Sequence, residues 1–290
     1  MMTLDNLFKD CELYTTEKPM IWTADGRQYE TEETVLHEHT IEITVDLMLF
    51  AKLVCTPRQL PELVIGRLKT SSLIQSVEDV KRLFICAKGN LAEVSLQSKE
   101  SRRSVVHNSR HELEGTSVAD STLASTPEVE STLVSAPETE ATCCSANHQY
   151  LQASDKSLKK LPGTEPDVSA VFTLAGYFKK DSAIHKTTNG THSAYLRTGD
   201  GSIFSFEDIG RHNALDKAVG YMLLNGYEAG ECMLYTTGRV PVDMVEKAIA
   251  SGIPVLVSKS VPTAEAVALA KEYSLTLLCK AWPDSFTRYA

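Results

Sequence analysis

The C-terminal part of the chain, residues 168–290, has the most regular pattern of apolar and polar positions. Short apolar runs, typical of buried strands, alternate with stretches in which apolar residues recur every three or four positions, as on one face of a helix. A Gly-Asp-Gly turn at 199–201, between two alternating segments, predicts a hairpin. We expect strands over 192–196, 202–206, 232–236, 253–258 and 275–279, and helices from 214 onward, over 242–250 and over 263–272.

This order of elements predicts an α/β domain with a mixed, largely parallel sheet covered by helices. In such sheets, ligands bind beyond the carboxyl ends of the strands. Polar segments directly follow four of the expected strands, so we expect one pocket at that edge of the sheet. These segments are 208–212, 237–239, 258–260 and 280–285.

The first hundred residues have the pattern of a smaller, β-rich unit. Strands are expected over 40–45, 47–55 and 82–87, and Pro57 precedes a helix over 60–68 whose apolar residues share one face. We therefore divide the chain into a β-rich N-terminal domain at 1–100, a connecting segment at 101–167 and a ligand-binding domain at 168–290.

The connecting segment contains a tandem ten-residue repeat. STLASTPEVE at 121–130 is followed by STLVSAPETE at 131–140. Both copies have too little apolar surface to offset the entropy lost on ordering, so we expect a disordered insertion. Two adjacent cysteines, Cys143 and Cys144, follow the repeat.

Charge and cysteine content narrow the class of protein. Residues 111–140 contain seven carboxylates and no Lys or Arg, so most of the net charge of −9 lies there and the remainder gives no sign of a nucleic-acid partner. No apolar run approaches the roughly 18 residues of a membrane span, and the N-terminus does not resemble a secretory signal. Seven cysteines, an odd number, favour the reducing cytoplasm over a disulfide framework.

The densest group of polar residues is EDIGRHNALDK at 207–217, where a strand is expected to meet a helix. Arg211 and His212 would lie at the helix N-terminus, where free backbone N–H groups and the helix dipole favour an anion. Two interpretations remain open at this point: a ligand site and an elaborate helix cap.

An anionic ligand would suit the other residues expected at this edge. Arg211 and Arg239 have planar guanidinium groups that match phosphate oxygens, and Gly238 lets the backbone approach a ligand closely. His192 begins a strand after a loop that contains a glycine, and it is either a packed residue or part of the cofactor site. The sequence has no GxxxxGK[ST] motif and no second cysteine pair at zinc spacing, so we expect no metal site.

The thiols of Cys143 and Cys144 allow several chemistries. A disulfide between neighbours is disfavoured because a trans peptide holds their Cα atoms ~3.8 Å apart, short of the usual ~4.4–6.8 Å. Burial as inert thiols is the common alternative, and we expect it for Cys55, Cys86, Cys232 and Cys279, which fall within apolar strands. The pair at 143–144 lies instead in a polar segment. We therefore favour an accessible reactive thiol that can carry a persulfide or a mixed disulfide.

At these residues the sequence resembles the FdhD family, the formate dehydrogenase accessory sulfurtransferases. Residues 207–217 are similar to the family's EDxGRHNAxDK, and TNGTHSA at 188–194 is similar to its TGGxHxA, with Asn189 in place of a glycine. The resemblance covers nearly the whole chain outside the repeat. Further similar blocks are CTP at 55–57, TGR at 237–239, GIPVLVSKS at 252–260 and the pair Glu32-Glu33.

The resemblance implies a fold and a function. It implies a C-terminal domain with the three-layer α/β/α fold of cytidine deaminases, without their zinc, and a homodimer. It also implies sulfur relay: a cysteine desulfurase loads a loop cysteine, and the sulfur passes to the molybdenum cofactor of formate dehydrogenase, bis(molybdopterin guanine dinucleotide). The family's segment after the last strand carries part of the cofactor site and corresponds here to Lys280, Ala281, Trp282, Pro283, Asp284 and Ser285. To these we add Arg211, His212, Gly238, Arg239 and His192 from the expected pocket.

The thiols depart from the family pattern. Many members have Cys-x-x-Cys, whereas Ala146 or Asn147 stands at the second position here, depending on whether Cys143 or Cys144 is aligned with the first. Two functions therefore stay in view. One is a sulfur carrier acting through a persulfide, and the other is a non-catalytic scaffold that binds the molybdenum cofactor but has lost the relay.

Overall fold

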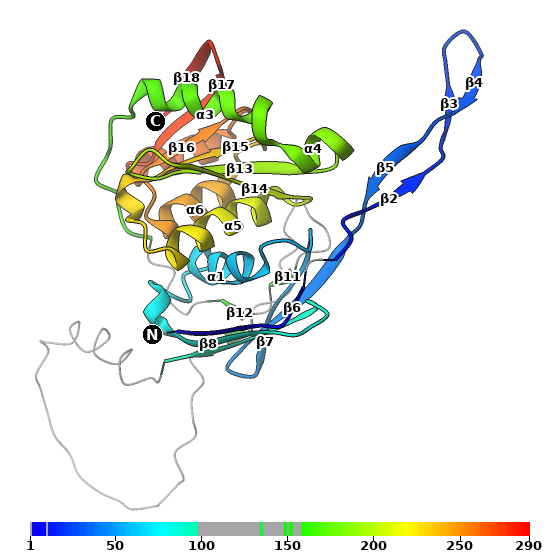
Figure 1. Cartoon of the computed structure of the whole chain (residues 1–290). Helices are drawn as coiled ribbons and strands as arrows, with labels where there is room; N and C mark the ends of the chain where they lie inside the picture. Colours follow the sequence, from blue (N-terminus) through cyan, green and yellow to red (C-terminus); the bar gives the residue numbers. More distant parts are fainter. Residues whose placement is uncertain (1, 10, 98–133, 136–147, 150, 153–157) are drawn as a thin grey trace, which may run out of the picture.

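The computed structural model describes residues 2–9, 11–97, 134–135, 148–149, 151–152 and 158–290. Cys143 and Cys144 lie outside these residues, as does most of the acidic repeat. Two six-stranded sheets lie on either side of a layer of helices (Figure 1).

The N-terminal sheet contains the three predicted strands, a strand at 91–96 that was not predicted and that lies inside the sheet, and a short strand at each edge. Alternation along β6 buries Ile41, Ile43 and Val45 completely, and they pack under α1 (Leu60–Thr70). The predicted helix at 60–68 is thus confirmed and is slightly longer. The strand order is β1 (Thr3–Asn6), β8 (Val80–Ile85), β9 (Leu91–Leu96), β6 (His39–Val45), β7 (Met48–Cys55) and β11 (His148–Gln149).

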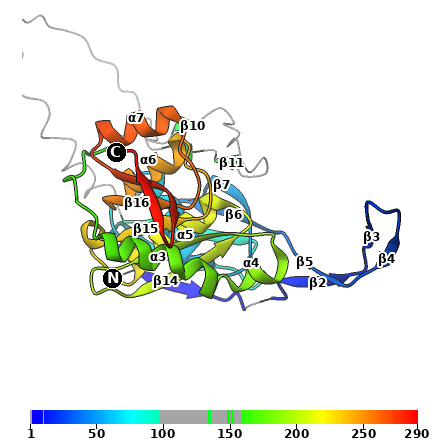
Figure 2. The same ribbon diagram turned by 90° about the horizontal axis from the view of Figure 1, so that it is seen from above.

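An arm, residues 14–36, projects from this sheet into solvent (Figures 1 and 2). It consists of two consecutive antiparallel ribbons, in which β2 pairs with β5 and β3 pairs with β4. The apolar pattern did not predict it. Its strands are β2 (Tyr14–Glu17), β3 (Met20–Trp22), β4 (Gln28–Glu30) and β5 (Glu33–Leu36).

The C-terminal sheet is mixed, as predicted, but only its central strands are parallel. β15, β16 and β17 run parallel, whereas hairpins at both sides add antiparallel strands. The prediction of a largely parallel sheet therefore holds for the centre alone. The order is β14 (Ile203–Asp208), β13 (His192–Arg197), β15 (Met233–Thr236), β16 (Val255–Ser258), β17 (Thr276–Trp282) and β18 (Ser285–Arg288).

Helices cover both faces of this sheet, which gives three layers (Figure 1). One face packs on α5, α6 and α7, and the other packs on α3. The helices are α3 (Val168–Asp181), α4 (Ala183–Thr188), α5 (Arg211–Leu224), α6 (Val242–Ser251) and α7 (Ala264–Glu272). Short elements elsewhere are the 3₁₀ turns η1 (Val77–Asp79) and η3 (Ala229–Glu231) and the paired strands β10 (Val134–Ser135) and β12 (Leu151–Gln152).

The end of the chain differs from the prediction. The last strand was expected to finish at 279, but β17 continues to Trp282 and turns back into β18. An irregularity at Lys280, whose φ is 51°, lets the strand continue after a local twist. Segment 280–285 is therefore a hairpin of the sheet and not a free tail.

Helices α1 and α5 join the two halves of the molecule through glycines. A Cβ atom on Gly66 would overlap the backbone carbonyl of Asp216, and one on Gly220 would overlap that of Glu62. The two helices therefore cross with their backbones in contact, which only glycine permits.

Candidate functional site

The polar block at 207–217 is largely buried inside the protein. The Asp208 carboxylate accepts hydrogen bonds from the backbone N–H of Thr56 (3.0 Å) and of Gly210 (2.9 Å), and from the Asn213 amide (3.0 Å). It also forms an ion pair of 2.7 Å with Lys217, and neither side chain is exposed. These residues therefore join α5 to the N-terminal half.

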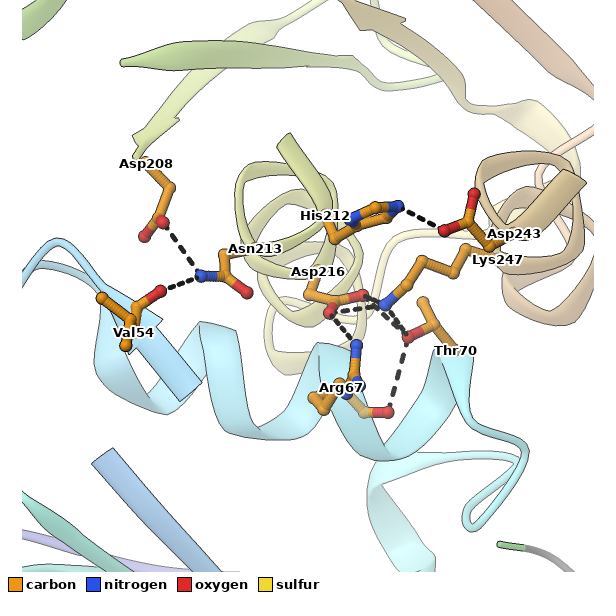
Figure 3. Close-up of polar contacts among 9 residues, drawn as sticks. All are labelled: Val54, Arg67, Thr70, Asp208, His212, Asn213, Asp216, Asp243 and Lys247. Atoms are coloured by element: carbon orange, nitrogen blue, oxygen red, sulfur yellow. Dashed lines mark hydrogen bonds and ion pairs between the residues drawn. The ribbon is translucent and has the colours of Figure 1, made fainter. Parts of the chain in front are cut away.

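Asp216 makes the second connection between the two halves (Figure 3). Its carboxylate lies 2.6 Å from the Lys247 ammonium, 3.6 Å from the Arg67 guanidinium and 2.7 Å from the Thr70 hydroxyl. Burial lowers the pKa of Lys247 to about 8, against the opposing effect of Asp216. The ion pairs of Asp216 with Arg67 and Lys247 therefore connect α5 to α1 and to α6.

Glu207 has a different structural task. Its carboxylate accepts hydrogen bonds from the backbone N–H groups of Ile184 (2.9 Å) and His185 (2.8 Å). These groups lie in the first turn of α4, where N–H groups lack helical partners. Glu207 therefore holds α4 against the sheet, and the block serves mainly to position elements.

Arg211 and His212 begin α5, as the sequence predicts. The His212 ring nitrogen Nε2 lies 2.7 Å from the Asp243 carboxylate of α6 (Figure 3). Burial raises the pKa of Asp243, but the hydrogen bond and charge of His212 lower it, and the net shift is downward. This pair joins the first turns of α5 and α6.

Two arginines meet at the strand ends. The Arg211 side chain lies directly on Gly238, where an added Cβ would approach the Arg211 Cδ atom to 2.8 Å. Burial lowers the pKa of Arg211, Asp243 raises it and the nearby Arg239 lowers it further. Arg211 and Arg239 thus share one edge of the sheet, as expected from the strand order.

A pocket of about 310 Å³ lies at the same edge of the sheet, and neither Arg211 nor Arg239 is among its lining residues. His192 and Thr237 line it at the ends of β13 and β15, as the motif positions predict. The Lys259 ammonium lies 4.2 Å from the Phe178 ring centroid and 5.0 Å from that of Trp282, which are cation–π distances. The full lining is Phe178, His185, Asn189, Gly190, Thr191, His192, Ile209, Thr237 and Lys259.

The pKa of His192, which lines this pocket, lies below its ordinary value. Burial lowers its pKa, the nearby His185 and His212 lower it further, and Asp208 opposes them. The His185 Nδ1 atom lies 2.7 Å from the Thr191 carbonyl oxygen, so Nδ1 carries the donated proton. Two imidazoles and one ammonium therefore line this space, and such N–H donors suit an anion.

The predicted residues at 280–285 do not share one environment. Ala281 is buried, and its carbonyl accepts a hydrogen bond of 3.2 Å from the Tyr235 hydroxyl. Trp282 is 44% exposed and lies beside Lys259, whereas Lys280 is exposed at the irregularity. The remaining residues, Pro283, Asp284 and Ser285, are exposed at the hairpin turn.

The five described cysteines differ in burial, and Cys11 is the exposed one among them. Cys55, Cys232 and Cys279 are buried as expected, and burial raises the pKa of each thiol, so they are poor nucleophiles. The prediction that Cys86 is also a core residue is wrong, because β8 ends at Ile85 and the thiol is only half-buried. Burial raises the pKa of Cys86, but backbone N–H groups of 88–91 lower it to below its usual value.

Sequence reasoning missed three residues of this region. Phe178 and His185 line the pocket from α3 and α4, and no motif spacing links them to the strand ends. Asp243 lies in the first turn of α6, where a carboxylate is common for reasons of the helix dipole alone. Among the described residues, no three His, Cys, Asp or Glu side chains are placed to share a metal ion.

No helix in the described ranges has both the length and the apolar character needed to cross a membrane.

A family model for the FdhD/NarQ family matches residues 36–290. The sulfur carrier protein FdhD of Halalkalibacterium halodurans is 30% identical over 261 residues, which cover 89% of this chain and 87% of that protein. That of Shouchella clausii is 28% identical over 260 residues, 88% of each chain.

A solved structure has a similar fold. It is the crystal structure of a protein assigned as a formate dehydrogenase accessory protein from Desulfotalea psychrophila. The TM-score is 0.66 and the sequence identity is 22%, over 96% of this chain and 97% of that chain. The likeness therefore extends over both sheets.

Proposed function

Because the chain belongs to the FdhD/NarQ family, we propose that it is a sulfur carrier required for formate dehydrogenase activity. The observation that carries this proposal is the match at 36–290, together with the relatives named sulfur carrier protein FdhD along nearly nine-tenths of the chain. The three-layer C-terminal domain supports the proposed likeness to cytidine deaminases.

The sulfur is proposed to travel as a persulfide on Cys143 or Cys144. The thiolate attacks the outer sulfur of a persulfide on a cysteine desulfurase, forms a new S–S bond and releases the donor cysteine as a thiolate. The nearest described residues after these cysteines, His148 and Gln149, pair with Lys52 and Ala51 of β7. The buried thiols of Cys55, Cys232 and Cys279 do not compete, because their raised pKa values keep them protonated.

Loading of these thiols can be measured directly. Incubation with a cysteine desulfurase and L-cysteine should add sulfur to the wild-type protein, seen by mass spectrometry after alkylation. The Cys143→Ala/Cys144→Ala variant should lose this addition, whereas Cys86→Ala, which removes the described thiol with a lowered pKa, should keep it. Equal loading of the double variant and the wild type would show that the assignment is wrong.

The acceptor is proposed to be bis(molybdopterin guanine dinucleotide), bound at the strand ends in the cytoplasm. Arg211 and Arg239 supply paired positive charge for its phosphates. Lys259 and Trp282 supply a cation and an aromatic face at the mouth of the neighbouring pocket. Gly238 leaves room for the Arg211 side chain, which a Cβ would displace.

Guanosine diphosphate is a convenient probe of this site. It should bind the wild-type protein and raise its melting temperature. Arg211→Ala should weaken binding by ~1.5–3 kcal/mol, roughly 10- to 150-fold, because a hydrogen bond to a charged group is lost. Arg288→Ala removes a guanidinium paired with Glu165 and should leave the affinity unchanged. If the Arg211→Ala protein bound guanosine diphosphate with the affinity of the wild type, the strand ends would be excluded as the binding site.

A non-catalytic scaffold is the second candidate, favoured by the missing Cys-x-x-Cys spacing. A scaffold would bind guanosine diphosphate in the same way but would acquire no sulfur. The loading experiment and the binding experiment therefore separate the two functions.

A further inference from the structure

The hairpin between β6 and β7 holds apolar side chains in solvent. We call its residues 46–49 the tip. Leu47 is 96% exposed, and Met48 and Leu49 are each 38% exposed. The tip extends from the N-terminal sheet on the side away from the C-terminal sheet (Figure 1). Consecutive exposed apolar residues add little to the stability of a fold, and they are typical of a surface that a partner covers.

Leu47 also has a backbone conformation that leucine disfavours. The φ angles of Asp46 and Leu47 are 48° and 71°, and two such residues between paired strands form a type I′ turn. Glycine is the usual second residue of this turn, because a Cβ atom crowds the backbone in the left-handed region. Since the Leu47 side chain is exposed, its packing does not offset this strain. The fold alone therefore does not explain a leucine here.

The neighbouring strand β9 fixes the tip in place. The Asp46 N–H donates a hydrogen bond of 2.9 Å to the Val94 carbonyl, and the Asp46 carboxylate accepts one of 3.0 Å from the Leu96 N–H. Met48 pairs with Val45, whose side chain is completely buried. The apolar residues thus stand on an ordered support, which reduces the conformational entropy lost when a partner binds.

Strand β7 connects the tip to the thiols that are proposed to carry sulfur. His148 of β11 pairs with Lys52 of β7, and Lys52 lies four residues after Met48, ~13 Å along the strand. Cys144 lies four residues before His148, so its Cα atom lies at most ~14 Å from that of His148. A domain of roughly 100 residues has a radius of gyration of ~13 Å and a diameter of more than ~30 Å. A globular partner on the tip can therefore reach the thiols.

The proposed acceptor site lies on the other sheet, which leaves the tip to the sulfur donor. The strand-end pocket belongs to the C-terminal sheet, and the layer that contains α1 and α5 separates that sheet from the N-terminal one (Figure 1). We propose that the cysteine desulfurase docks on the tip, with the Leu47 side chain in an apolar groove of the donor. This inference rests on the proposed sulfur-carrier function and adds the surface that brings the donor persulfide within reach.

The rate of sulfur loading at increasing concentrations of a cysteine desulfurase tests the tip. Leu47→Asn removes the apolar side chain and suits the left-handed conformation, so this protein should melt no lower than the wild type. It should need about tenfold more desulfurase for the half-maximal rate, which corresponds to ~1.4 kcal/mol of lost binding. Leu47→Met keeps an apolar group and should load as the wild type does. Leu7→Asn is the matched control, because Leu7 is 57% exposed and follows β1 at the opposite edge of the sheet.

A small persulfide separates docking from the reactivity of the thiols. Glutathione persulfide transfers its outer sulfur to the same thiolate and leaves as glutathione thiolate, so it needs no docking surface. It should load Leu47→Asn as fast as the wild type. Slower loading of Leu47→Asn by this reagent would overturn the proposal, as would wild-type dependence of Leu47→Asn on desulfurase concentration or a change in its oligomeric mass. Wild-type protein that gains no sulfur from either donor would instead remove the sulfur-carrier function, and the docking surface with it.

Discussion

Replacing Asp208 by alanine is expected to lower the free energy of unfolding by about 3–5 kcal/mol, the usual cost of removing one partner from a buried ion pair. The Lys217 ammonium would remain fully buried without its carboxylate. Hydrogen bonds from Thr56 and Asn213 would be lost at the same time. Urea denaturation followed by circular dichroism measures the loss.

Two comparison variants identify the cause. Asp208→Ala/Lys217→Met removes the stranded charge together with its partner and should recover part of the lost stability. Asp5→Ala breaks the exposed pair with Arg82 and should cost no more than about 1 kcal/mol. If Asp208→Ala were as mild as Asp5→Ala, the ion pair would not hold the two halves together.

Gly66→Ala is expected to cost roughly 3 kcal/mol or more. The added Cβ would overlap the Asp216 carbonyl, so α1 and α5 would have to separate along their closest contact. Such a shift would also disturb the pairing of Asp216 with Lys247. The melting temperature by calorimetry reports the change.

Gly176→Ala is the matched control. Gly176 lies in α3 with open space around its Cα atom, so alanine should stabilise the helix by ~0.5–1 kcal/mol. A loss of stability in Gly66→Ala together with a gain in Gly176→Ala would show that the loss arises at the crossing of α1 and α5. A neutral Gly66→Ala protein would contradict the close approach of these helices.

The elements with a clear apolar period were predictable from the sequence. β6 alternates buried and exposed residues, and β15 and β16 are buried throughout, as expected for strands with helices on both faces. The arm was not predictable, because its short strands mix polar and apolar residues and contain no fully buried residue. The extent of β17 depended on a backbone irregularity at Lys280, which an apolar pattern does not reveal.

The polar block shows why the site was harder to predict than the fold. Carboxylates, an amide and a lysine at the start of a helix are equally suited to a ligand and to a buried network. Which of the two forms depends on the residues that pack against this block. One of them, Thr56, donates a hydrogen bond to Asp208 from 152 positions earlier in the chain. The segments after β15 and β16 were predictable because parallel strands bring their carboxyl ends to one edge. His192 reaches the same edge from the first residue of β13, because β13 runs antiparallel to β15. Phe178 and His185 reach the pocket from α3 and α4 without such a rule.

Formate dehydrogenase activity in cells is the most direct test of sulfur relay through Cys143 and Cys144. A strain that lacks its own accessory protein should regain activity with the wild-type chain and with Cys86→Ala. The Cys143→Ala/Cys144→Ala protein, expressed to the same level and still binding guanosine diphosphate, should restore none. Full restoration by that double variant would contradict a sulfur relay and leave the chain as a cofactor-binding scaffold.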